Sequence, residues 1–99
     1  MVCMAHYIIL VNWTDQGIRN VKETTKRAEA ARGMAEKAGG KIQLFYTLGE
    51  YDIVGVAEMP DDEALMKFLL TLGSLGNVRT KTLKAWTEAE AAKLVAQLT

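Results

Sequence analysis

Lys41-Ile-Gln-Leu-Phe-Tyr-Thr-Leu48, Gly49-Glu50-Tyr51 and Asp52-Ile-Val-Gly-Val-Ala-Glu-Met59 form the continuous stretch that decides the fold of this chain. The first run alternates apolar and polar side chains, and the last is rich in β-branched residues, as is typical of strands. The connection that begins with Gly49 is short enough for a turn. We therefore predict a β-hairpin over 41–59.

A strand and a helix are predicted on the N-terminal side of this hairpin. Residues 6–13, HYIILVNW, are rich in β-branched and aromatic side chains and have the length of a strand in a packed sheet. Thr14 or Asp15 can cap a following helix, and apolar residues recur at helical spacing from Ile18 onward. We expect one long helix over 15–38, ended by Gly39-Gly40.

A helix, a strand and a final helix are predicted on the C-terminal side. Pro60 followed by three acidic residues is a typical helix start, and this helix is expected to stop near Gly73. Residues 78–86 alternate as a polar outer strand, and Thr87 with Glu90 fits a capping box that opens a helix over 87–98. The order β-α-β-β-α-β predicts an α+β, ferredoxin-like fold. Its four-stranded antiparallel sheet should have strands 6–13 and 52–59 in the centre.

Composition narrows the class of protein. The chain has 99 residues, the size of one domain, which we assign to 5–99 with a core over 5–86. Twelve basic and twelve acidic residues give a formal charge of zero, so we expect neither nucleic-acid nor membrane binding. No apolar run is long enough to span a bilayer. The single Cys3 cannot form an internal disulfide, and we expect a cytoplasmic protein.

The central strands have apolar residues on both of their faces. In strand 6–13, Tyr7, Ile9, Val11 and Trp13 point one way, whereas Ile8 and Leu10 point the other. A sheet covered by helices on one side only should have a polar second side. We therefore predict that something covers this second face, either another copy of the chain in a homo-oligomer or the C-terminal helix folded back on the sheet.

His6 is the first candidate for catalysis. It is the only histidine of the chain, and an imidazole titrates in the range that suits a general base. The simpler interpretation is a partly exposed side chain at the start of a strand. No Cys-x-x-Cys or His-Glu-x-x-His spacing occurs, so we expect no metal and no cofactor.

The turn Gly49-Glu50-Tyr51-Asp52 concentrates polar groups, with two carboxylates beside a phenol. Asp52 is the second candidate for proton transfer, and Glu50 and Tyr51 are candidates for ligand binding. Turn formation explains the same residues, since Gly tolerates unusual backbone angles and Asp bonds its own backbone.

Further candidates for ligand binding lie at the ends of strands. Asn12 and Trp13 end the first strand, and Arg79 could neutralise an anion, although charges on an outer strand also discourage unwanted pairing. Tyr7 and Trp86 would add apolar walls to a pocket.

The residues of the hairpin resemble those of the GYD domain family. The turn stands as G-E-Y-D at 49–52, followed by Ile53-Val54-Gly55-Val56, and the stretch from Leu72 to Leu83 resembles a later segment of that family. The resemblance runs from about Ala5 to Trp86 and implies a ferredoxin-like domain of the dimeric α/β barrel type. It implies no catalytic residue.

Three functions fit these features. The first is a homo-oligomeric module that binds a small, partly apolar molecule between helices and sheet or between subunits. The second is a cofactor-independent enzyme of the monooxygenase or isomerase kind, in which His6 or Asp52 removes a proton. The third is a structural or regulatory assembly protein. RNA binding is not expected, because the central strands lack a basic and aromatic platform.

Overall fold

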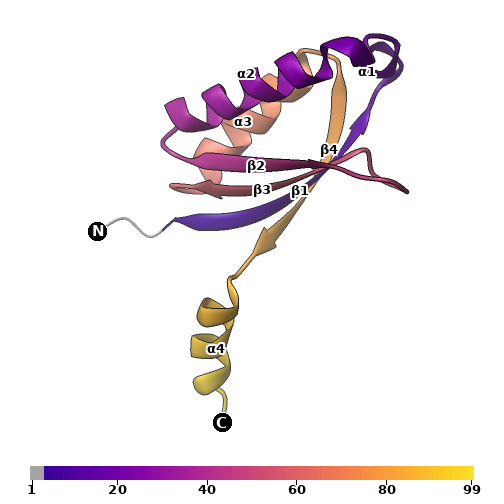
Figure 1. The fold of residues 1–99 in the computed structure, drawn as a ribbon. Coiled ribbons are helices and arrows are strands. Elements are labelled where there is room, and N and C mark those ends of the chain that lie inside the picture. The colour runs from indigo at the N-terminus through magenta and orange to yellow at the C-terminus, as the bar shows by residue number, and fades with distance from the viewer. Residues whose placement is uncertain (1–3) are drawn as a thin grey trace.

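The computed structural model describes residues 4–99, so Cys3 lies outside the described residues. A four-stranded antiparallel sheet runs in the order β2-β3-β1-β4, with helices α2 and α3 on one of its faces (Figure 1). The strands are β1 (Ala5–Trp13), β2 (Lys41–Tyr46), β3 (Ile53–Met59) and β4 (Val78–Ala85). This order confirms the predicted α+β, ferredoxin-like fold with β1 and β3 in the centre.

The core lies between the sheet and the helices α2 (Thr24–Lys37) and α3 (Asp62–Ser74). Alternation along the strands turns every second residue toward these helices, so the largest fully buried side chains, Ile9 and Met59, lie on this side. The helices contribute small alanines from α2 and larger apolar residues from α3. The buried residues of the core are Tyr7, Ile9, Val11, Ala31, Ala35, Ile53, Ala57, Met59, Leu65 and Phe68.

The predicted single helix over 15–38 is wrong, because the chain breaks it into three pieces. These are α1 (Asp15–Arg19), the 3₁₀ turn η1 (Val21–Glu23) and α2. Asn20 leaves helical geometry at the break, with a φ of −109°. The guanidinium of Arg27 donates to the carbonyls of Asn20, at 3.0 Å, and Gly17, at 3.2 Å, and so connects α2 to the break and to α1 before it. The Asn20 carbonyl also accepts from the backbone N–H of Glu23.

A loop distant in sequence fixes the start of α1. The Thr14 hydroxyl accepts from the backbone N–H of Gly17 and donates to the carbonyl of Gly76. A Cβ on Gly17 would lie 2.0 Å from the carbonyl oxygen of Asn77. Glycine at position 17 therefore lets α1 lie directly against the loop before β4.

The second face of the sheet, which we call the open face, carries apolar side chains without a cover. Register places Ile8 opposite both Val56 and Leu83, and Leu10 opposite Val54. Phe45 extends this patch onto β2, and about half of its side-chain surface is exposed. The apolar side chains of the open face are Ile8, Leu10, Phe45, Val54, Val56 and Leu83.

The C-terminal helix α4 (Glu88–Ala96) does not cover the open face, so the alternative in which it folds back on the sheet is wrong. Figure 1 shows α4 standing away from the sheet beyond the end of β4. No residue of α4 is buried, although its predicted capping box between Thr87 and Glu90 is confirmed. The projecting helix gives the molecule an extent of 52 × 30 × 17 Å.

Candidate functional site

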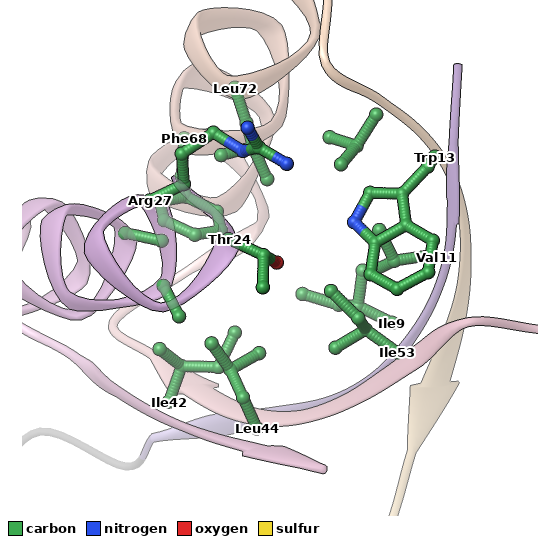
Figure 2. A pocket seen from close by; sticks show the side chains of 13 residues that line it. Ile9, Val11, Trp13, Thr24, Arg27, Ile42, Leu44, Ile53, Phe68 and Leu72 are labelled. Atoms are coloured by element: carbon green, nitrogen blue, oxygen red, sulfur yellow. The ribbon is translucent and has the colours of Figure 1, made fainter. Parts of the chain in front are cut away.

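A cavity lies between α2, α3 and the helix-covered face of the sheet, and we call it the Trp13 cavity (Figure 2). Its volume is about 60 Å³, and its walls are almost entirely apolar. The residues that line it are Ile9, Val11, Trp13, Thr24, Arg27, Ala28, Ala31, Ile42, Leu44, Ile53, Phe68, Leu72 and Val78.

Helical spacing places the α2 side of this cavity. Thr24, Arg27, Ala28 and Ala31 follow one another at i, i+3, i+4 and i+7, so they share the face of α2 that lies over the sheet. The two alanines are too short to fill the space below them. The cavity is therefore a consequence of an alanine-rich helix lying over long side chains of the sheet.

Three polar side chains line the Trp13 cavity. Figure 2 shows the indole nitrogen of Trp13, the hydroxyl of Thr24 and the guanidinium of Arg27 all directed into the same space. The Trp13 Nε1 is buried and has no hydrogen-bond partner among the described residues. The Thr24 hydroxyl lies 3.2 Å from the Tyr46 hydroxyl.

A groove between α2 and α3 adjoins the cavity. It has a volume of about 200 Å³ and shares Arg27, Ala31, Leu72 and Val78 with the cavity wall. Met34 and Leu75 add apolar surface along it. The Trp13 cavity therefore has an apolar extension toward the surface.

Only Trp13 and no other predicted site residue lines this cavity. His6 lies near the start of β1, whereas Asp52 precedes β3 and contacts the other end of β1, so the structure does not bring the two candidate catalytic groups together. The Asp52 carboxylate accepts from the backbone N–H of Trp13 at 2.9 Å, and its own N–H donates to the Val11 carbonyl. Asp52 therefore secures the end of the hairpin against β1.

His6 lies on the open face between two carboxylates. Its Nε2 is 3.3 Å from Glu58 Oε1, and its Nδ1 is 3.5 Å from Glu90 Oε1 of α4. The contact with Glu90 is an ion pair at most and not a hydrogen bond, and the buried Nδ1 therefore has no hydrogen-bond partner among residues 4–99. Lys41 lies 3.1 Å from the other oxygen of Glu58. This arrangement is a charged cluster at the edge of the open face.

The remaining predicted ligand-binding residues are spread over the surface. Asn12 and Arg79 are opposite one another on β1 and β4. The Lys81 ammonium lies 6.0 Å from the centre of the Tyr51 ring, near the limit for a cation–π contact. Glu50 is exposed in the hairpin turn, and Trp86 is 56% exposed before α4.

A second polar cluster joins Tyr7 to two residues that the sequence did not indicate. The Tyr7 hydroxyl donates to Asp62 at the start of α3, and the Lys84 ammonium lies 2.9 Å from the same carboxylate oxygen. Burial and the hydrogen bond to Asp62 raise the pKa of Tyr7 to about 12. The hydrogen bonds from Tyr7 and Lys84 lower the pKa of Asp62. A phenol held protonated in this way is a structural donor and not a base.

One feature of the sequence, the position of Lys84 along its strand, indicates this cluster. Lys84 alternates onto the same side of β4 as Val78 and Thr82, toward the helices, where it can reach an acidic residue at the start of α3. The sequence contains no such indication for Thr24 and Arg27, since each occupies an ordinary polar position of a helix.

Within residues 4–99, no group of three or more histidine, cysteine, aspartate or glutamate side chains could hold a metal ion. No helix over these residues is long and apolar enough to cross a membrane.

The sheet and its two covering helices define the chain as a ferredoxin-like α+β protein. Comparison with known families defines the chain more narrowly than its fold does. The model of the GYD domain matches residues 7–95, and the chain belongs to this family. One relative is the glutamine synthetase and cystathionine beta-lyase binding protein of Thermus thermophilus. The two are 31% identical over 84 residues, which cover 83% of this chain and 88% of the relative. No solved structure matches the chain.

Proposed function

We propose that this protein is a homo-oligomeric binding module whose subunits associate through their open faces. The observation that carries this proposal is the uncovered apolar patch on the two central strands. Leaving such side chains in water forgoes roughly 25 cal/mol for each Å² of apolar surface, and exposed patches of this kind typically mark interaction sites. A second copy supplies an equally apolar surface.

The charge distribution of the open face supports the same association. On the central strands β1 and β3 its side chains are apolar, whereas the outer strands add Gln43 and Lys81, and further polar or charged groups lie toward the ends of the strands. His6, Lys41 and Glu58 mark one end, and Arg79 marks the other. An apolar centre with a polar rim is the usual anatomy of a protein interface.

Light scattering coupled to size exclusion tests this association. We expect the unmodified protein to elute as an assembly of two or more copies, and Val56→Lys to elute as a monomer, because the new charge would be buried in the interface. Leu70→Lys is the matched control, since Leu70 is 65% exposed on α3, away from the open face. Equal assembly of the Val56→Lys variant and the unmodified protein would overturn the proposal.

We also propose that the assembly binds a metabolic enzyme. Support comes from the Thermus relative, whose name gives glutamine synthetase and cystathionine beta-lyase as its partners. Purified enzymes of these two kinds can be immobilised, with the relative as the positive control. Binding of this chain to either one would support the proposal. No binding under conditions in which the relative binds would contradict it.

A small-molecule site within each subunit is the second candidate function, and the Trp13 cavity is the observation that favours it. An apolar cavity with a few convergent polar groups is the usual form of such a site. The enzymatic alternative has less support, since neither His6 nor Asp52 lines the Trp13 cavity or the adjoining groove.

A further inference from the structure

We propose that the Trp13 cavity binds a small carboxylate with a short apolar tail, held by Trp13, Arg27 and Thr24. This inference rests on the small-molecule part of the proposed function and names the chemical class of the ligand.

The Trp13 indole indicates that the ligand carries a hydrogen-bond acceptor. An indole nitrogen can only donate a hydrogen bond, and here it is buried without an acceptor. Buried polar atoms in native proteins almost always have a partner. The group that completes this site therefore brings an acceptor into the cavity.

Arg27 adds a positive charge to the same space. Two of its five N–H groups donate to the carbonyls of Asn20 and Gly17, which hold the guanidinium in place at the cavity wall. Over residues 4–99, no carboxylate lies within 4.0 Å of this guanidinium, so its charge has no internal partner. A fixed guanidinium with free donors suits a planar carboxylate.

Thr24 is the third polar group of the cavity. Its hydroxyl can donate to a carboxylate oxygen while it keeps its contact with the Tyr46 hydroxyl, which can also act as donor. Figure 2 shows the three polar groups directed into a space that the aliphatic side chains of Ile9, Val11 and Ile53 also line. The bound molecule should therefore be polar at one end and apolar at the other.

The size of the cavity limits the apolar end. A volume of about 60 Å³ corresponds to roughly two water-sized groups, because one water occupies about 30 Å³ of liquid. The carboxylate group takes up most of this space, so a tail of two or three carbons extends into the adjoining groove of about 200 Å³. Inorganic phosphate or sulfate would leave the apolar walls without contact.

Nuclear magnetic resonance of the ¹⁵N-labelled protein tests the proposal, because the chain has only two indole N–H signals, from Trp13 and Trp86. Butanoate is the probe, and neutral butanamide, with the same tail, is its matched control. We expect butanoate to shift the Trp13 signal saturably and the Trp86 signal not at all. Butanamide and inorganic phosphate should bind at least tenfold more weakly.

Two variants test whether the charge of Arg27 recognises the carboxylate. Arg27→Gln should weaken butanoate binding at least tenfold, whereas Arg32→Gln, which removes an exposed arginine of the same helix, should leave it unchanged. The spectrum of each variant reports whether the fold is retained, and the comparison of butanoate with butanamide needs no variant.

Each contrary result has a distinct meaning. Equal binding of butanoate and butanamide would overturn the carboxylate class but keep a small-molecule site. No shift of the Trp13 signal with either compound would overturn the site itself. Neither result bears on assembly through the open face, which light scattering measures separately.

Discussion

The hydroxyl of Tyr7 donates a hydrogen bond to the carboxylate of Asp62, 55 positions further along the chain. Tyr7 is 2% exposed in the middle of the core layer, and Asp62 begins α3. The Lys84 ammonium contacts the same carboxylate and lies over the Tyr7 ring at 5.9 Å from its centre. One carboxylate thus joins the central strand β1, the edge strand β4 and the start of α3.

Replacement of Tyr7 by phenylalanine should destabilise the protein by about 1 kcal/mol, because the ring still fills the core but the hydrogen bond is lost. Urea unfolding followed by circular dichroism measures the change. Tyr46→Phe, at a half-exposed hydroxyl, is the control and should cost less. A neutral effect of Tyr7→Phe would show that the bond adds no stability.

The titration of Tyr7 and Asp62 should lower the free energy of unfolding at both high and low pH. The pKa of Tyr7 is raised to about 12 from 10.0, so between these values the unfolded chain loses its proton first and stability decreases as pH rises. The pKa of Asp62 is lowered, so the unfolded chain gains a proton first as pH falls below about 4. Urea midpoints across pH should show both slopes, and Tyr7→Phe should flatten them.

Two glycines should respond in opposite ways to alanine. Gly17→Ala should cost about 2–3 kcal/mol, because the new Cβ would meet the Asn77 carbonyl at 2.0 Å. Gly33→Ala should add about 0.5–1 kcal/mol, because nothing lies within 4 Å of the new Cβ in α2 and alanine is the better helix former. Thermal unfolding of the two variants checks this contrast, and effects of the same sign would contradict it.

Removal of α4 by truncation after Trp86 should change the free energy of unfolding by less than about 1 kcal/mol. The helix buries none of its residues, so the core does not depend on it. Chemical unfolding at equal protein concentrations compares the two chains. A loss of several kcal/mol would show that α4 packs on the domain or on a second copy.

Sequence patterns predicted the sheet well because strand periodicity is local. The alternation of Tyr7, Ile9 and Val11 with Ile8 and Leu10 indicates two apolar faces directly, and the turn at 49–52 fixes the hairpin. The break near Asn20 was missed because it depends on contacts with the distant loop at Asn77 and on the Arg27 side chain. Such contacts leave no periodic signal.

The candidate site was only partly predictable for the same reason. Trp13 was expected at a pocket from its place at the end of a strand, and the structure places it there. Thr24 and Arg27 reach the cavity because the broken helix positions the first turn of α2 over the sheet. His6 and Asp52 were alternative candidates for proton transfer on chemistry alone; His6 lies at the start of β1, and Asp52 contacts the other end of this strand.

Native mass spectrometry of the unmodified protein tests the central claim most directly, since it counts the copies that share their open faces. One chain has a mass of 10.9 kDa, and our account predicts a species of two or more times this mass that persists on dilution to micromolar concentration. A spectrum that contains only the 10.9 kDa monomer would contradict assembly through the open face.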